Sequence, residues 1–234
     1  MVEQRTPMGA LVAALVFRGI LILILGLTVP WLANLTNPGS TVESANFHMN
    51  AWIMIIDVIT IVVVARLLAA EGSRLGEMLE FRASDIGWGL LFFLIIVCTF
   101  FLATMAASFG QNGLAIGFLP QVPLWVGIAA VPAAVTIAIA EEVLYRGYLQ
   151  PRFEQRLGSW PGMLVVALVF GLQHIGFALS SPTDALARVA VTFVTGIVFA
   201  LLYWWRKRLV PLIIAHALLD LLGLSLPTLM LAVA

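Results

Sequence analysis

Apolar residues fill the chain in long runs that short polar stretches separate. A membrane helix needs about 20 consecutive apolar residues, and several runs reach that length. We expect spans at roughly 8–33, 51–70, 86–108, 122–145, 161–179, 186–204 and 209–223. The tail 224–234 is either an eighth short element or a continuation of the last span after a break at Leu226-Pro227. The pattern predicts an all-α, polytopic transmembrane bundle of about seven to eight spans, forming a single domain over residues 1–234.

Basic residues are concentrated on alternate connections between these spans. The positions are Arg5, Arg66, Arg74, Arg82, Arg146, Arg152, Arg156, Arg206, Lys207 and Arg208. The opposite connections, near 34–50, 109–121 and 180–188, together hold only Arg188. Because short cytoplasmic loops are enriched in Lys and Arg, we expect the N-terminus and the basic loops to face the cytoplasm. The first run, Met8 to Ala33, is too long for a cleaved signal sequence and is interpreted as a retained helix.

Composition agrees with a membrane protein and narrows the choice of function. Of the 234 residues, 62% are hydrophobic and 10% are charged, and the mean hydropathy is +1.07. Soluble globular domains lie far from these values. The formal net charge is zero and no basic cluster is large, so we expect no nucleic-acid partner. Cys98 is the only cysteine, so disulfides play no part.

Two connections have recognisable local chemistry. The stretch 71–85 carries apolar residues at helical spacing among charges, which predicts a short amphipathic helix on the cytoplasmic interface. The sequence GSWP at 158–161 predicts a tight turn between two helices. Gly158 suits the end of one helix, while Ser159 and Pro161 suit the start of the next.

Ionisable side chains inside the predicted spans are few, and each is a functional candidate because such a group costs several kcal/mol in hydrocarbon. They are Arg18, Asp57, Glu141, Glu142, His174, His216 and Asp220. Three i,i+4 pairs share a helix face, namely Glu142 with Arg146, Phe170 with His174, and His216 with Asp220. Asp57 has no obvious partner, and we interpret it as structural, paired with Arg18; the alternative is a residue of the site or of a substrate groove. Arg18 taken alone is expected to extend toward the cytoplasm.

Helix lengths bring the candidates to similar depths. Glu141 lies 17 residues before Gly158, and His174 lies 16 residues after it. At about 1.5 Å per residue, both are roughly 25 Å from the turn and face each other in a helical hairpin. His216 follows Arg208 by eight residues, which places it about 12 Å below the cytoplasmic boundary. We therefore expect the acids and histidines to converge in the cytoplasmic third of the membrane.

Such a cluster is suited to hydrolysis of a carbonyl compound in either of two ways. A buried glutamate can act as general base toward water while histidines stabilise the oxyanion. Alternatively, two histidines and a carboxylate are a usual ligand set for catalytic zinc, with a second glutamate left as base. The residues alone do not decide between these chemistries.

At these positions the sequence resembles the CPBP family of intramembrane proteases, which includes the type II CAAX prenyl protease and the bacterial Abi (bacteriocin self-immunity) proteins. The family motifs EExxxR, FxxxH and HxxxN or HxxxD stand here in order. They read Glu141-Glu142-Val-Leu-Tyr-Arg146, Phe170-Gly-Leu-Gln-His174 and His216-Ala-Leu-Leu-Asp220. The resemblance covers about residues 122–223, the expected catalytic core, while the N-terminal helices of 8–121 match only in being hydrophobic.

The resemblance implies a helical intramembrane endopeptidase in a bacterial inner or plasma membrane, with its active site toward the cytoplasm. Its substrate would be a peptide or protein, lipidated or not. Glu141 would activate water, with Glu142 and Arg146 in support. His174 and His216 would bind the oxyanion, or bind zinc together with Glu141; a metal-free mechanism is equally open. Prenyl protease members carry Asn where this chain has Asp220, so Asp220 is expected to orient His216 or to be protonated.

Two other classes of function compete with the protease. A non-catalytic bacteriocin-immunity or scaffold membrane protein would keep the fold without using Glu141 as a base. A proton-coupled transporter would use Asp57 and the other acids as a relay, but such proteins show repeated halves or matched broken helices, which this sequence lacks.

Overall fold

The computed structural model describes residues 6–108 and 122–234, and these residues are entirely helical or in connections. The principal helices are α1 (Met8–Thr36), α2 (Val42–Ala70), α4 (Ser84–Ser108), α5 (Leu124–Glu141), α6 (Gln150–Leu157), α7 (Ser159–Leu172), α8 (Pro182–Arg206), α9 (Val210–Asp220) and α10 (Leu226–Val233). Short irregular helices complete the order: α3 (Leu75–Met78), η1 (Glu142–Leu149), η2 (Gln173–Phe177) and η3 (Leu221–Ser225). The predicted all-α class is confirmed.

Within the described residues, seven helical segments are long and apolar enough to cross a membrane. Their outer surfaces expose large apolar side chains such as Leu27, Leu94 and Leu168. A surface of this kind is suited to lipid rather than to water. The segment Leu124–Leu157 has 34 residues and is about 50 Å long, so it extends well beyond a hydrocarbon core of about 30 Å. The chain is an integral membrane protein.

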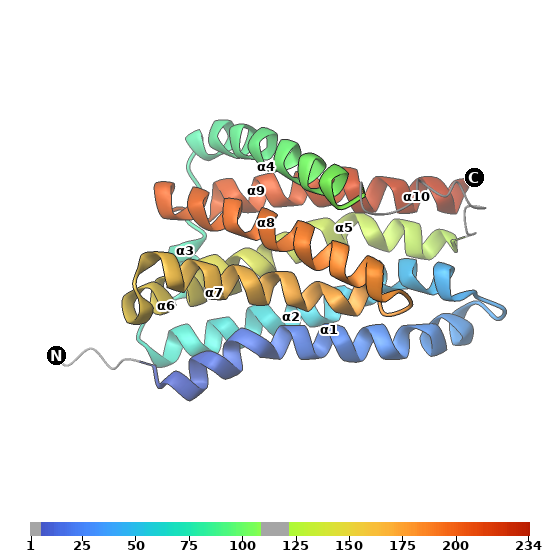
Figure 1. Cartoon of the computed structure of the whole chain (residues 1–234), viewed down its shortest axis with the longest axis horizontal. Coiled ribbons are helices and arrows are strands. Elements are labelled where there is room, and N and C mark those ends of the chain that lie inside the picture. Colours follow the sequence, from blue (N-terminus) through green and yellow to red (C-terminus); the bar gives the residue numbers. More distant parts are fainter. Residues whose placement is uncertain (1–5, 109–121) are drawn as a thin grey trace.

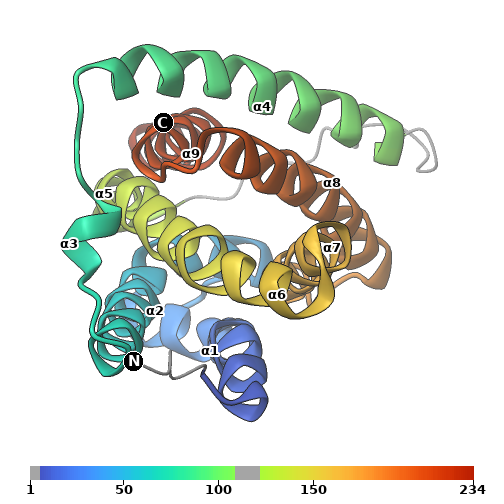
Figure 2. The same cartoon turned by 90° about the vertical axis from the view of Figure 1, so that its left-hand side faces the viewer.

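The helices form one bundle whose long axes run broadly side by side (Figure 1). The start of α1 and the connections through α3 and between α6 and α7 lie at one end of the bundle, and the C-terminus lies at the other (Figure 1). Helix α4 covers α8 and α9 on one side, while α1 and α2 lie on the opposite side of the centrally placed α5 (Figure 2). The middle of the continuous element α5–η1–α6 is enclosed by the other helices, and every residue from Ala140 to Gln150 is buried.

The segment η1 is a π-helix rather than a continuation of α5. Its backbone bonds close over i→i+5, which widens the turn and changes the direction of each side chain relative to an α-helix. The change begins at Glu142, directly after Glu141, and Pro151 stands at the start of α6. Single π turns within α-helices frequently accompany functional sites.

Two local predictions have different outcomes. The turn at Gly158 is confirmed, because α6 ends at Leu157, α7 begins at Ser159, and Gly158 has a φ of 87° that favours glycine. The expected amphipathic helix over 71–85 is reduced to the four residues of α3. Gly72, with a φ of 77°, turns the chain out of α2, and α4 already starts at Ser84, so little of the stretch can be helical.

Small residues allow α1 to approach η2 closely. A Cβ added to Gly176 would lie 2.8 Å from the backbone oxygen of Ile22, and one added to Gly26 would overlap the carbonyl of Gly176. One turn away, a Cβ on Gly19 would touch the Cβ of Gln173 at 3.4 Å. Close contacts through glycine are a common way to join membrane helices. Here they bring α1 close to η2, so that Arg18 of α1 lies beside the buried Glu141.

At the end of the bundle that holds the start of α1, a polar contact joins α2 to α6. Glu71, directly after α2, forms an ion pair with Arg152, whose Nε lies 3.1 Å from Oε1 of Glu71. The hydroxyl groups of Thr6 and Tyr148 also donate to Glu71, and the Arg152 guanidinium stacks 3.8 Å from the centroid of the Tyr148 ring. This cluster fixes the segment before α1 to the two helix ends.

Candidate active site

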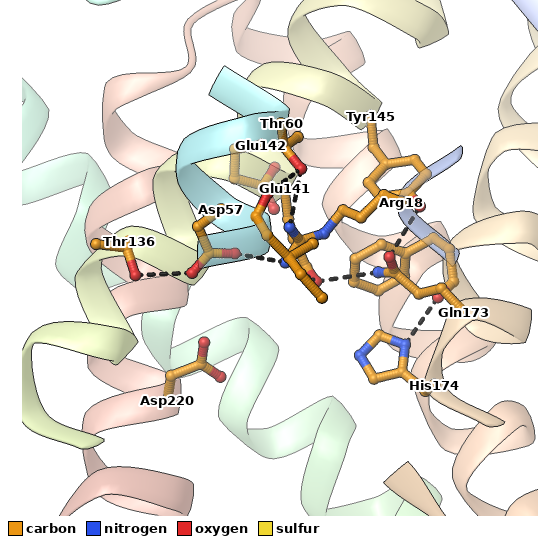
Figure 3. A network of polar contacts seen from close by, with 12 residues as sticks. Arg18, Asp57, Thr60, Thr136, Glu141, Glu142, Tyr145, Gln173, His174 and Asp220 are labelled. Carbon is orange, nitrogen blue, oxygen red and sulfur yellow. Dashed lines mark hydrogen bonds and ion pairs between the residues drawn. The ribbon is translucent and has the colours of Figure 1, made fainter. Parts of the chain in front are cut away.

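Glu141, the last residue of α5, is buried with 2% of its surface exposed. Its Oε1 accepts two hydrogen bonds, from Nη2 of Arg18 at 3.2 Å and from Nε2 of Gln173 at 3.0 Å (Figure 3). Within the described part of the chain, Oε2 has no hydrogen-bond partner. The two oxygens of this carboxylate therefore differ: one is held from two sides, and the other is left with its lone pairs.

Glu142, the first residue of η1, is fully buried and points to a different set of partners. Its Oε1 accepts from Nη1 of Arg146 at 3.1 Å, the contact expected for an i,i+4 pair. The same oxygen lies 2.8 Å from Nδ1 of His216 on α9. Because a carboxylate only accepts, Nδ1 of His216 carries the hydrogen. Glu142 therefore connects η1 to α9.

His216 brings the other acids together. With Nδ1 directed to Glu142, its Nε2 lies 3.8 Å from Oε2 of Glu141 and 3.6 Å from Oδ2 of Asp220. The ring of Phe199 packs against the imidazole with centroids 4.8 Å apart. The imidazole consequently stands between three carboxylates and is restrained by an aromatic neighbour. Residues predicted from the first and third motifs thus meet in the structure.

His174 lies in η2, on the opposite side of Glu141 from Asp220 in Figure 3. Its Nδ1 donates to the carbonyl oxygen of Phe170 at 2.8 Å, so the neutral ring keeps Nε2 as an acceptor. The rings of Phe170 and Phe177 lie 5.1 Å and 5.8 Å from the imidazole, so Phe170 packs against His174 as expected for two residues on one helix face. The structure shows no direct bond between His174 and Glu141; the neighbouring Gln173 makes that contact instead.

Arg146 is buried among aromatic rings although it is charged. Its guanidinium carbon lies 4.3 Å from the Phe170 centroid and 4.9 Å from the Phe199 centroid. It also donates to the carbonyl oxygen of Gly196 at 3.2 Å. Cations over aromatic faces are stabilised most strongly where water is excluded. Arg146 thereby joins η1 to α7 and α8 and neutralises Glu142.

The N-terminal helices contribute a second buried arginine. Arg18 is 0% exposed, so the expectation that it extends toward the cytoplasm is wrong. Its Nη2 lies 2.8 Å from Oδ1 of Asp57, and its Nη1 donates to Thr60 at 3.1 Å. The predicted pairing of Asp57 with Arg18 is confirmed, and Thr136 of α5 donates to Oδ2 of Asp57 at 2.7 Å. Asp57 holds Arg18 in the membrane interior instead of leaving it free to reach the surface.

Sequence reasoning missed two members of this cluster, Gln173 and Tyr145. Gln173 precedes His174 in the second motif, and its Oε1 accepts from the Tyr145 hydroxyl at 2.9 Å. An amide within an apolar run was a signal, because a buried polar group needs a hydrogen-bond partner. It was missed because the search considered only ionisable side chains. Tyr145, inside the first motif, gave no such signal because tyrosines are common in apolar segments.

The ligand set considered for zinc does not fit the observed arrangement. Among residues 6–108 and 122–234, no group of three or more His, Cys, Asp or Glu side chains could hold a metal ion. In the set Glu141, His174 and His216, only Oε2 of Glu141 and the two Nε2 atoms are left to face an ion, and these three side chains do not form such a group. We therefore derive no step through a metal.

The fold and this cluster define a class: a polytopic helical membrane protein with acids and imidazoles gathered in its apolar interior. Residues 122–222 match the protein family described as Type II CAAX prenyl endopeptidase Rce1-like. The chain carries a domain of this CAAX endopeptidase (CPBP) family, and membership indicates a protease with a protein substrate. No curated protein and no solved structure matches the chain. The buried Glu141, Glu142 and His216 are consistent with a catalytic site.

Proposed function

We propose that the protein is an intramembrane endopeptidase that hydrolyses a peptide bond of a membrane-associated substrate or a substrate's C-terminal tail. One observation carries the proposal. The buried Glu141 carboxylate has one oxygen fixed by two donors, while the other oxygen accepts no hydrogen bond from the described residues and lies 3.8 Å from Nε2 of His216. A general base needs this combination of fixed position and available lone pair.

In the proposed reaction Oε2 of Glu141 takes a proton from water, and the water oxygen attacks the carbonyl carbon of the scissile bond. The neutral His174, whose Nε2 is an acceptor, holds the second hydrogen of the water. As the tetrahedral intermediate collapses, the C–N bond breaks and Glu141 returns its proton to the leaving amine. Water is consumed, and no other reactant is needed.

His216 is proposed to stabilise the negative charge that develops on the carbonyl oxygen. Glu142 fixes its ring through Nδ1, so a proton on Nε2 can be donated to the oxyanion. The carboxylate of Asp220, 3.6 Å from the same Nε2, favours a proton there by its negative charge. This role replaces direct donation by Asp220, which an ionised carboxylate cannot perform.

Basic connections gathered at the N-terminal end of the bundle support a cytoplasmic site (Figure 1). The long segment Leu124–Leu157 extends toward the same end, so Glu141 lies inside the bundle and not at its surface.

The test is Glu141→Gln, which keeps the size of the side chain and removes the base. The purified variant in proteoliposomes is given a farnesylated fluorogenic peptide ending in a CAAX sequence, and the C-termini of cellular proteins are compared with and without each form. We expect cleavage to fall by about 10²–10⁴-fold, the usual contribution of a positioned acid–base group. Glu77→Gln, an exposed acid, is the matched control and should cleave normally. Full biological activity of Glu141→Gln would favour the non-catalytic immunity or scaffold role instead.

A further inference from the structure

The half of the chain outside the matched family segment reaches directly into the candidate active site. Residues 122–222 contain Glu141, but one of the two donors to its Oε1 is Arg18 of α1. The other donor, Gln173, belongs to none of the motif positions. Both donor side chains are buried, with exposed fractions of 0% and 3%. These contacts are too well enclosed to be incidental surface interactions.

The Arg18 guanidinium has more partners than a structural ion pair requires. Asp57 at 2.8 Å already supplies a counter-charge, and Thr60 occupies the other terminal nitrogen. Nη2 nevertheless also donates to Glu141, so it is shared between two carboxylates (Figure 3). Asp57 is itself held by Thr136. A chain of polar contacts from α2 and α5 thus aims one guanidinium nitrogen at one oxygen of Glu141.

Gln173 is oriented in the same way. The Tyr145 hydroxyl donates to its Oε1, so the amide nitrogen must point in the other direction, toward Glu141. Gly19 allows α1 to approach the Gln173 backbone, which brings the two donors to the same oxygen. The two donors therefore arrive from α1 and η2, elements that are far apart in the sequence and packed together in the fold.

We propose that Arg18 and Gln173 are positioning residues that form a two-donor clamp on Oε1 of Glu141, leaving Oε2 as the proton acceptor. The inference rests on the proposed function, because the clamp matters for the rate only if Glu141 is the base. Neither residue touches the substrate. Without the clamp the carboxylate can rotate, and Oε2 no longer faces the water in a fixed geometry.

The decisive variant removes the buried ion pair as a unit, as R18M/D57L. The net formal charge of Arg18, Asp57 and Glu141 stays at minus one, and the hydroxyls of Thr60 and Thr136 keep their bonds to the carbonyls of Ile56 and Ala133. Replacing both members of a buried pair is often neutral for stability, unlike removing one. A second variant, Gln173→Met, removes the other donor without changing charge. Gln150→Met is its control, since Gln150 is also buried but bonds to Glu154 and Ala200.

Two measurements are made on each folded variant in proteoliposomes: kcat and KM for the farnesylated peptide, and the infrared carboxylate band that Glu141→Gln removes. We expect kcat to fall about 100-fold in R18M/D57L, the size of effect that a displacement of about 1 Å produces. KM should stay near the wild-type value, because binding groups are untouched. Gln173→Met should lower kcat in the same sense, and the Glu141 band should shift in both variants.

Wild-type kcat and an unshifted band in folded R18M/D57L would remove Arg18 from the clamp and leave it a structural counter-ion. If R18M/D57L does not fold, Gln173→Met decides, and wild-type behaviour there overturns the clamp. A different pattern marks failure of the proposed function: Glu141→Gln cleaves like the wild type, or the wild type cleaves neither the peptide nor the C-termini of cellular proteins. The infrared band then still shows whether the clamp exists.

Discussion

Nδ1 of His216 lies 2.8 Å from Oε1 of Glu142, the oxygen that also accepts from Arg146. The acid next to the proposed base therefore fixes the imidazole that faces that base. Adjacent glutamates in the sequence serve different partners, and the start of the π segment at Glu142 separates their directions.

Replacing Glu142 with Gln should lower kcat for the farnesylated peptide by less than Glu141→Gln does. The amide can still contact His216, but if it turns its NH₂ group toward Nδ1, the ring carries a proton on Nε2 alone and is neutral, so it stabilises the oxyanion less than a charged ring does. Rates of the two variants, normalised to folded protein, provide the check. A loss equal to that of Glu141→Gln would indicate that Glu142 takes part in proton transfer itself.

Arg146→Met should destabilise the protein by about 3–5 kcal/mol, because it leaves the fully buried Glu142 without its cation. It also removes the contacts with the faces of Phe170 and Phe199. Thermal unfolding in detergent measures the change. Arg66→Met alters an exposed arginine and should leave the unfolding temperature nearly unchanged. Equal stability of the two variants would contradict the role assigned to Arg146.

Gly176→Ala should separate α1 from η2, since the added Cβ would lie 2.8 Å from the Ile22 carbonyl oxygen. Overpacking of this kind costs about 1–3 kcal/mol. Because α1 carries Arg18, we also expect a lower kcat in the protein that remains folded. Gly87→Ala is the control, as nothing lies within 4 Å of a Cβ there. Equal unfolding temperatures and rates in the two variants would show that the close approach is dispensable.

Glu71 should make stability depend on acid pH. Burial alone would raise the pKa of its carboxyl, but hydrogen bonds, led by that from Arg152, hold the pKa below its ordinary value of 4.5. A lowered folded-state pKa means that this carboxylate stabilises the fold above about pH 4.5 and that the stabilisation is lost as the pH falls through the folded value. The difference in unfolding temperature between the wild type and Glu71→Gln should therefore stay constant from pH 7 to about pH 4.5 and shrink below that pH. A difference that stays constant there too would show that the ion pair is unimportant.

The sequence was sufficient for the helical class, the number of spans and the turn at Gly158, because hydrophobic runs and glycine conformation are local properties. It also placed Glu142 beside Arg146, an i,i+4 contact. It failed for Arg18, whose direction depends on where Asp57 of another helix lies. It did not predict the π geometry of η1 either, because the i→i+5 bonding begins within one continuous helical segment.

For the candidate site too, the sequence predicted which residues take part but not which residues of other helices they contact. Hydrocarbon makes charged groups conspicuous, so six candidates of the motifs could be named from the sequence. The contacts between helices could not be predicted in the same way. That Gln173 and not His174 bonds to Glu141 could be seen only from the packing of η2 against α5.

The contact between Arg18 and Glu141 also has a consequence for biogenesis. Chains are synthesised from the N-terminus, so α1 and α2 enter the membrane before α5 is made. The Arg18–Asp57 pair can then form first as a neutral unit and receive the acid of α5 when it arrives. The early helices would act as an internal insertion partner for the later ones, and residues 122–222 expressed alone would have to place Glu141 in lipid without that cation.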